Sequence, residues 1–212
     1  MEEMSRVLSR FRMKHIFIFM IWMLLLGTGF FRLSTYSNTP GVQAKNFPQW
    51  PFQSAIQRSQ DIATLVIFVH PHCPCSEASI GELERLVPKI QGKVQSVVMF
   101  FKPKNKSDEW VKSRLWEKTK MIPGVQSFFD NEGVEAQRFG AKTSGQIFLF
   151  DEEANLIFSG GITPERGHMG DSIGRKAILS FVEIGKTEVT KTAVFGCSLD
   201  KPERAPADKG VQ

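Results

Sequence analysis

The sequence predicts an α/β sandwich, in which helices cover both faces of a central mixed sheet, preceded by one N-terminal transmembrane helix. Residues 15–31 form an apolar segment without acidic or strongly basic side chains. Beyond this segment, apolar strands alternate with amphipathic helices, an order that implies parallel strands. A β-hairpin near the end of the domain then adds antiparallel strands at one edge of the same sheet.

The segment 15–31 is about 17 residues long, at the lower limit of what crosses a bilayer. Four basic residues precede it: Arg6, Arg10, Arg12 and Lys14. Because positive charge stays on the cytoplasmic side, we expect residues 1–14 in the cytoplasm and the domain on the periplasmic or extracytoplasmic side of the cell membrane. A cleaved signal peptide is the alternative. Its only acceptable cleavage sequence, Val-Gln-Ala at 42–44, lies too far beyond Phe31, which favours a single-pass, uncleaved signal anchor.

The net charge of +5 is concentrated near the N-terminus. Residues 1–32 hold five basic and two acidic residues, whereas the rest of the chain holds 22 basic and 20 acidic ones. The globular part is nearly neutral, which argues against a nucleic-acid partner. The partner expected for residues 15–31 is the membrane.

Composition divides the remaining chain into a linker over residues 32–60, a folded domain over 61–186 and a polar tail over 187–212. The linker is rich in Ser, Thr, Asn, Gln and Pro and has little periodicity. Its candidate docking side chains are Trp50 and Phe52.

The first strand of the domain is expected over residues 64–69, an apolar and β-branched run typical of a strand buried on both faces. Apolar residues then recur at helical spacing and predict an amphipathic helix over 74–90. The remaining elements follow in order: a strand over 94–102, a helix over 108–120, a short strand over 125–129, a helical turn over 134–139, hairpin strands over 146–150 and 156–159, and a helix over 171–184.

The chemistry of the chain is expected at residues 70–75 (His-Pro-His-Cys-Pro-Cys), between the first strand and its helix. Pro74 suits the first helical position, which needs no backbone N–H. Cys73 then becomes the N-cap, where free N–H groups and the helix dipole stabilise a thiolate and lower its pKa. His70 and His72 are near enough in sequence to add positive charge or to accept a proton. Cys73 is therefore the predicted nucleophile.

Cys75 is the expected resolving partner, although its spacing from Cys73 is unusual. Cysteines two positions apart on a helix have close Cα atoms but diverging Cβ directions. A disulfide between them would need a distorted first turn and would be strained, labile and relatively oxidising. The chain has three cysteines in all, and an odd number in an exported protein points to a reactive thiol.

The stretch 68–73, followed by a helix, resembles the strand, loop and first cysteine of thioredoxin-fold oxidoreductases, and the order of elements over residues 60–185 agrees. The resemblance implies a thioredoxin-like sandwich and thiol–disulfide oxidoreductase activity. Ser76 stands where that family has its second cysteine. Three residues stand where the family has its cis-proline: Thr143, Ser144 and Gly145. Both departures set this site apart from that of ordinary thioredoxins.

A more particular set of motifs carries a second resemblance. The motifs are His-Pro-x-Cys-Pro-Cys at 70–75, Gly-Ala-x-Thr-Ser-Gly at 140–145, Ser-Gly-Gly-Ile-Thr at 159–163, Arg-Gly-His-x-Gly-Asp at 166–171 and Val-Phe-Gly-Cys at 194–197. Together, over residues 65–199, they resemble a small set of bacterial thioredoxin-fold proteins called RedB-like. This resemblance implies redox character and includes the tail cysteine.

Cys197 in the tail has apolar neighbours, which favour docking of its segment on the domain. Cys197 would then resolve a mixed disulfide or a sulfenic acid on Cys73, and a free cysteine on a loose tail is the alternative. The residues expected around the cysteines are Pro74, Ser76, Thr143, Ser144, Gly145, Arg166 and His168. We expect a thiol- or disulfide-containing protein, or a small oxidant, as the partner, and no cofactor.

Copper binding or delivery is the main alternative function. Cys73, Cys75, His168 and Cys197 form a soft ligand set suited to Cu(I) or Zn. Copper-delivery proteins of the thioredoxin fold typically use C-x-x-x-C and a histidine just before the hairpin, whereas this chain has C-x-C and Thr-Ser there. A second alternative, a non-catalytic, membrane-tethered interaction module, would require unreactive thiols.

Overall fold

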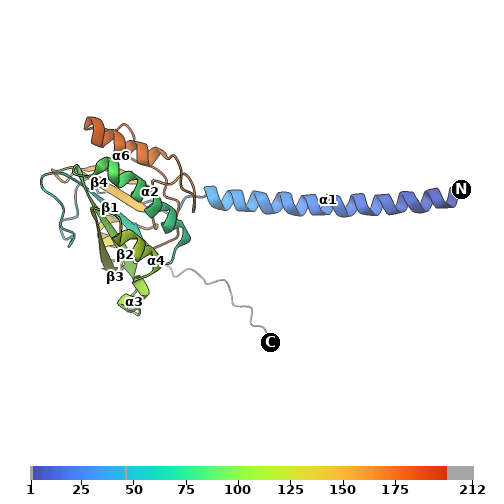
Figure 1. Ribbon diagram of the computed structural model, residues 1–212, viewed down its shortest axis with the longest axis horizontal. Coiled ribbons are helices and arrows are strands. Elements are labelled where there is room, and N and C mark those ends of the chain that lie inside the picture. Colours follow the sequence, from blue (N-terminus) through green and yellow to red (C-terminus); the bar gives the residue numbers. More distant parts are fainter. Residues whose placement is uncertain (1, 46, 200–212) are drawn as a thin grey trace. The chain divides into compact units, whose positions relative to one another are not determined.

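The computed structural model describes residues 2–45 and 47–199, with side chains from Met13 onward. The part of the predicted tail beyond Leu199 lies outside the described residues. The chain divides into two units, an N-terminal helix that ends at Asn38 and a compact α/β unit that begins at Thr39 (Figure 1).

The N-terminal helix, α1 (Glu2–Asn38), contains the predicted membrane segment and is longer than expected. Its stretch Met13–Asn38 is 26 residues long and apolar enough to cross a membrane. At 1.5 Å per residue this stretch rises about 39 Å, more than the ~30 Å of a bilayer core. The helix ends shortly before Pro40, because proline disfavours helical geometry at the residue that precedes it.

The compact unit contains one five-stranded mixed sheet in the order β3-β2-β1-β4-β5. Its strands are β1 (Ala63–Val69), β2 (Val94–Lys102), β3 (Val125–Asn131), β4 (Gln146–Phe150) and β5 (Leu156–Gly160). β1, β2 and β3 run parallel, while β4 is antiparallel to both β1 and β5. Every residue of the central strand β1 is buried, as its apolar sequence predicts.

Both faces of the sheet are covered, which confirms the predicted sandwich. The first face packs against α2 (Pro74–Ile90), α4 (Arg114–Lys120) and α6 (Ile173–Ile184), with Leu65 and Leu83 in one shared core. The second face packs against α5 (Val134–Phe139) and the chain before β1, with Phe68 and Phe139 in its core. Successive side chains of β1 point to opposite faces and so contribute to both cores.

The predicted helix over residues 108–120 is in fact two helices, α3 (Asp108–Val111) and α4. The Ser113 hydroxyl accepts a hydrogen bond from the Trp116 N–H and so acts as the N-cap of α4. Serine competes well for this position and starts a new helix instead of continuing the old one. In the same way, Ser172 caps α6, which begins two residues later than predicted.

Residues 32–38 of the predicted linker belong to α1, and the chain from Thr39 onward belongs to the compact unit. Trp50 lies with its ring centroid 5.0 Å from those of Phe139 and Phe150. The predicted docking through Trp50 is therefore confirmed. Phe52 is fully exposed, so its predicted docking role was wrong.

Candidate active site

Cys73 lies at the junction of β1 and α2, where the sequence predicted it. It is the N-cap of α2, with φ −88° and ψ 122°, and Pro74 is the first helical residue. The Cys73 N–H donates to the His70 carbonyl at 3.2 Å, which closes the turn between strand and helix. This position favours a thiolate, because the positive end of the helix dipole lies beside it.

The tail returns across the site as a strap formed by residues 194–199. The Ser144 N–H donates to the Cys197 carbonyl at 2.8 Å, and the Leu199 N–H donates to the Lys142 carbonyl at 2.9 Å. These bonds pair the strap antiparallel with the chain before β4. Backbone hydrogen bonds therefore hold the segment of the tail cysteine on the domain, as the sequence predicted.

Buried side chains anchor the strap on both sides of its cysteine. Val194 is 1% exposed and Leu199 is 3% exposed. The Arg166 Nη1 atom donates to the Gly196 carbonyl at 2.6 Å. A Cβ atom at Gly196 would lie 1.9 Å from the Ser144 carbonyl oxygen, so this close approach requires glycine. The strap is part of the folded domain.

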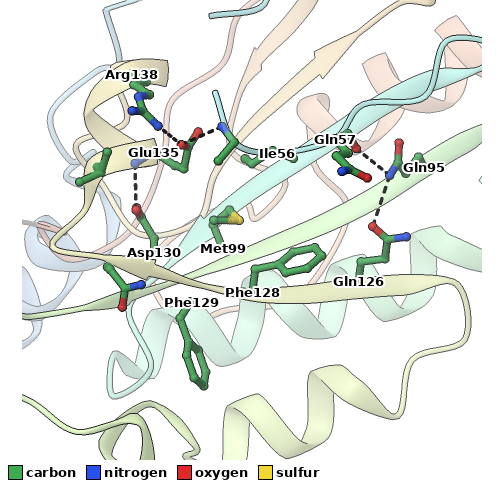
Figure 2. Close-up of a pocket in the computed structure, with 13 residues that line it drawn as sticks. Ile56, Gln57, Gln95, Met99, Gln126, Phe128, Phe129, Asp130, Glu135 and Arg138 are labelled. Atoms are coloured by element: carbon green, nitrogen blue, oxygen red, sulfur yellow. Dashed lines mark hydrogen bonds and ion pairs between the residues drawn. The ribbon is translucent and has the colours of Figure 1, made fainter. Parts of the chain in front are cut away.

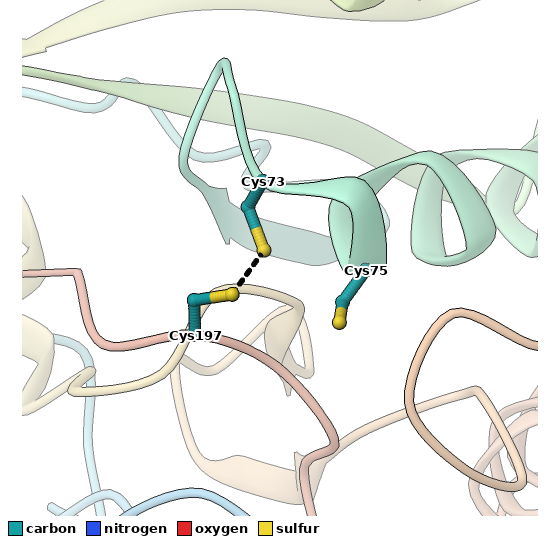
Figure 3. Close-up of side chains that lie close together, drawn as sticks. All are labelled: Cys73, Cys75 and Cys197. Atoms are coloured by element: carbon teal, nitrogen blue, oxygen red, sulfur yellow. Dashed lines mark hydrogen bonds between the residues drawn. The ribbon is translucent and has the colours of Figure 1, made fainter. Parts of the chain in front are cut away.

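The three cysteines meet at one point (Figure 3). The Sγ atoms of Cys73 and Cys197 are 2.7 Å apart and share a hydrogen bond, although 124 positions separate the residues. All three Sγ atoms lie within 4.8 Å of one another, and no disulfide joins these three cysteines in the structure. Cys75, the resolving partner expected from sequence, points into the same cluster from the first turn of α2. The hydrogen-bonded neighbour of Cys73 is Cys197.

The cluster stabilises a single negative charge on Cys73. Hydrogen bonds from Cys197 and then from Cys75 lower the pKa of the Cys73 thiol, and they outweigh burial, which acts in the opposite direction. At Cys75 the hydrogen bond from Cys197 also lowers the pKa, but the hydrogen bond with Cys73 and burial together raise it above its usual value. A thiolate on Cys73 therefore disfavours a second thiolate on Cys75, because like charges so close together repel each other.

Ser76 and Ser144, both predicted to surround the cysteines, form one buried network. The Ser76 hydroxyl donates to the His70 carbonyl at 3.0 Å and lies 2.7 Å from the Ser144 hydroxyl oxygen. The Ser144 oxygen also accepts from the His70 N–H at 2.8 Å. Because the Ser76 proton is already donated, Ser144 must donate to Ser76. Every proton in this network then has an acceptor.

Gly145 completes the loop that replaces the family's cis-proline. It has φ 91°, a left-handed conformation that favours glycine, and a Cβ atom there would lie 2.6 Å from the Ser79 hydroxyl oxygen. Its N–H donates to the Phe68 carbonyl at 2.8 Å, a bond that proline could not make. Thr143 donates from Oγ1 to the Val42 carbonyl at 2.9 Å and so joins this loop to the chain that follows α1.

The two histidines of the motif pack against Trp110 on the far side of the loop. His72 lies with Nε2 2.8 Å from the Trp110 carbonyl oxygen. His70 accepts a hydrogen bond at Nδ1 from the His72 N–H at 3.2 Å, and its ring is 5.5 Å from that of Trp110. The largest contributions to the low pKa of Cys73 come from the other two thiols. Tuning of Cys73 by an imidazole stays a prediction.

The potential metal ligands that gather in the described part of the chain are Cys73, Cys75 and Cys197. His168, which the sequence placed in the soft ligand set, lies outside this group. Its side chain is 60% exposed, and Nδ1 lies 2.8 Å from the Arg166 carbonyl oxygen. The predicted four-residue set is thus a three-thiol set in the structure.

Glu82 is a buried site-supporting residue that sequence reasoning missed. It lies on α2 with a fully buried side chain and accepts from Arg175 Nη1 at 2.7 Å and from the Gly170 N–H at 2.9 Å. These contacts tie α2 to α6 and to the loop that contains Arg166. The signal in the sequence was an acidic residue within the apolar face of a helix, a position that requires a paired charge.

Among the hollows in the described part of the chain, one lies beside the cysteine loop and another over the sheet. One of about 340 Å³ lies beside the cysteine loop, between the starts of α2 and α4, and is lined by His72, Cys73 and Arg114 among others. A larger one of about 650 Å³ lies over β2 and β3, near Met99, Phe128 and other residues (Figure 2). Asp130 in its wall has a pKa raised by burial. None of the predicted site residues lines the larger hollow.

Solved structures share this architecture. An uncharacterized conserved protein from Geobacillus kaustophilus is 20% identical, with a TM-score of 0.54 over 80% of this chain and 96% of its own. A hypothetical protein from Sinorhizobium meliloti is also 20% identical, with a TM-score of 0.53 over 79% and 97%. A secreted disulfide oxidoreductase from Mycobacterium tuberculosis aligns at 12% identity, with a TM-score of 0.41 over 57% and 80%. No protein-family model matches the chain, and no curated protein does.

The strand order β3-β2-β1-β4-β5, with a cysteine-capped helix directly after the central strand, decides the class of the fold. The chain has a thioredoxin-like fold. Thiol–disulfide oxidoreductases use this fold, and one end of its central strand is where the three cysteines meet. The predicted fold class is confirmed. The N-terminal helix is long and apolar enough to span a membrane.

Proposed function

We propose that the chain is a membrane-anchored, extracytoplasmic thiol–disulfide oxidoreductase whose redox pair is Cys73 and Cys197. The observation that carries this proposal is the 2.7 Å separation of their sulfur atoms at the N-terminus of α2. Two-electron oxidation, with loss of two protons and a small approach of the two sulfurs, would join them in a disulfide. The helix terminus stabilises the thiolate that forms when the disulfide opens. The motifs shared with RedB-like proteins support the same assignment.

The proposed reaction is reversible two-electron exchange with a substrate dithiol or disulfide. When the Cys73–Cys197 disulfide is reduced, the substrate loses two electrons and two protons and gains a disulfide bond. In the reverse direction, a substrate disulfide is opened and the pair is oxidised. Cys75 remains a thiol throughout and donates a hydrogen bond to the Cys73 thiolate, a role that its raised pKa supports.

The proposed location rests on the basic residues that precede the apolar part of α1 and on the chemistry of the pair. A disulfide persists on the extracytoplasmic side, where the environment is oxidising. A reporter enzyme that is active only outside the cytoplasm, fused after the last residue of the full chain, should be active. A reporter active only in its cytoplasmic form would contradict the location.

Redox titration tests the reaction. The full chain in detergent is equilibrated with glutathione buffers of graded potential, and its free thiols are counted after acid quenching. One two-electron transition is expected, absent from the Cys73→Ser and Cys197→Ser proteins and retained by Cys75→Ser. Three unreactive thiols at every potential would contradict the proposal and favour the interaction module.

Cu(I) binding is a second candidate, which one observation favours. Three thiols within 4.8 Å of one another match the preference of Cu(I) for soft sulfur ligands. Cys73, Cys75 and Cys197 would hold the ion without His168. A bound ion and the Cys73–Cys197 disulfide exclude each other, because both use the same two sulfurs.

A further inference from the structure

We infer that substrate exchange takes place at the Cys197 sulfur and that Cys73, the predicted nucleophile, is the internal partner. In the Cys73–Cys197 disulfide, an incoming substrate thiolate attacks Cys197 Sγ and displaces Cys73. This inference rests on the proposed oxidoreductase function and assigns the two sulfurs of that site to different steps.

The first support is the unequal exposure of the three cysteines. Cys73 is 2% exposed and Cys75 is 7% exposed, whereas Cys197 is only partly buried. Thiol–disulfide exchange needs direct access of the attacking sulfur to the attacked one. Of the two residues in the proposed disulfide, Cys197 is the more exposed and so the one that a substrate can approach.

The second support is the position of the strap. Its backbone pairs with residues 142–144, and Arg166 donates to the Gly196 carbonyl. Val194 and Leu199 hold its two ends in the interior. Cys197 therefore covers Cys73 from the strap side, and a substrate that approaches from there meets Cys197 before Cys73.

The hollow beside the cysteine loop provides no second route. Cys73 is one of the residues that line this hollow. The exposed fraction of Cys73 is 2% in total, and this value already counts any part of its surface that faces the hollow. A sulfur atom cannot reach a side chain that is so completely covered unless the loop moves. The folded arrangement thus leaves Cys197 as the accessible position.

The chemistry of the leaving group fits this assignment. Exchange is faster when the displaced sulfur is a more stable thiolate. Displaced Cys73 lies at the N-terminus of α2 and has hydrogen-bonding thiols beside it, which lower its pKa. The helix position and the contact with Cys75 both persist when Cys197 has bonded to the substrate.

The first substrate thiolate forms a bond to Cys197 Sγ, the bond between Cys197 and Cys73 breaks, and its electron pair stays on Cys73. A second substrate thiolate then attacks the substrate sulfur of this mixed disulfide. Cys197 leaves as a thiolate and takes up a proton, and the substrate leaves as a disulfide. A partner disulfide or a small oxidant later reoxidises the pair.

Mapping the mixed disulfide tests the inference. The oxidised full chain in detergent is mixed with glutathione over a range of concentrations, quenched with acid within milliseconds to seconds, digested and analysed by mass spectrometry. We expect glutathione on Cys197 at about ten times the amount on Cys73 or more, because access limits the exchange. Adducts mainly on Cys73, or equally on both, would overturn the inference.

Two controls make the result interpretable. The Cys75→Ser protein excludes migration of the adduct through the third thiol, and it should still carry the adduct mainly on Cys197. The starting protein must contain the Cys73–Cys197 disulfide. If that disulfide never forms, the proposed function itself fails, whereas a formed disulfide with adducts on Cys73 contradicts the order of attack alone.

Discussion

The hydroxyl oxygens of Ser76 and Ser144 lie 2.7 Å apart in a fully buried pair that joins the start of α2 to the loop before β4. Ser76 is one of the two departures from the ordinary thioredoxin pattern, and Ser144 belongs to the three residues that form the other. The pair also satisfies the backbone of His70 next to the cysteine turn. The two departures are therefore coupled, because one residue from each forms this hydrogen-bonded serine pair. The pair connects the cysteine loop with the chain segment on which the strap docks.

Replacement of Ser144 by alanine should destabilise the domain. The His70 N–H would lose its acceptor in the interior, and an unsatisfied buried donor costs about 1–3 kcal/mol of unfolding free energy. Tryptophan fluorescence during urea unfolding of the full chain in detergent measures the change. The matched control is Ser180→Ala, whose partly exposed hydroxyl donates to the Lys186 carbonyl and should matter by about 0.5 kcal/mol or less. Equal effects of the two substitutions would contradict the role of the network.

Replacement of Cys197 by alanine, which cannot donate a hydrogen bond, should raise the pKa of Cys73. The hydrogen bond from Cys197 is the largest contribution that lowers this pKa, and the one from Cys75 is the next. Ultraviolet absorbance of the thiolate, followed as a function of pH, should show a larger rise of the Cys73 pKa for Cys197→Ala than for Cys75→Ala. An ordinary thiol pKa for Cys73 in the unaltered reduced protein would contradict the account of the cluster.

The same shift predicts how stability depends on pH. The pKa of a cysteine thiol in the unfolded chain is about 8.5. When the pKa in the folded protein is lower, the thiolate stabilises the reduced folded protein, and this contribution is complete at pH values above about 8.5. The reduced protein should therefore lose stability as the pH falls from about 8.5 toward the lowered pKa of Cys73. Thermal unfolding of the reduced Cys73→Ser protein should lack this part of the pH dependence.

Replacement of Glu82 by alanine should be strongly destabilising. It leaves Arg175 without its buried partner and the Gly170 N–H without an acceptor, a loss of about 3–5 kcal/mol. Glu84 on the same helix provides the control, because its pair with Lys118 is exposed and worth about 1 kcal/mol or less. Similar unfolding midpoints for Glu82→Ala and Glu84→Ala would show that Glu82 does not tie the elements together.

Cu(I) binding, if it occurs, should depend on the cysteines and be indifferent to His168. Titration of the reduced full chain under argon, in competition with a Cu(I) chelator, should give one ion per chain. Each single cysteine-to-serine substitution should weaken binding, and His168→Ala should leave it unchanged because that side chain lies outside the thiol cluster. Loss of binding in His168→Ala would contradict the three-thiol set, and no binding in the unaltered chain would exclude the second candidate function.

Local patterns in the sequence predicted most of the fold. The apolar run of β1 and the helical spacing of α2 specify their burial directly, and the proline after Cys73 specifies the helix start. The predicted helix boundaries were wrong where a single polar residue caps a helix inside a longer stretch of helical spacing. Ser113 divides one predicted helix into two, because its hydroxyl satisfies the Trp116 N–H.

The candidate site was less predictable, because it depends on contacts between distant segments. Cys73 could be recognised from its neighbours, whereas its hydrogen bond with Cys197 joins positions 124 residues apart. The approach of the strap requires Gly196 and the backbone groups of residues 142–144, whose pairing follows no local periodicity. Similarly, the positions of His70 and His72 depend on Trp110, which lies after the next strand.

The most direct test of the whole account is the cysteine pairing of the full chain after mild oxidation. Peptide mapping by mass spectrometry, with metal content measured on the same sample, identifies the disulfide. The structure predicts a bond between Cys73 and Cys197, with Cys75 left as a free thiol. A bond between Cys73 and Cys75, or three free thiols, would contradict the proposed redox pair.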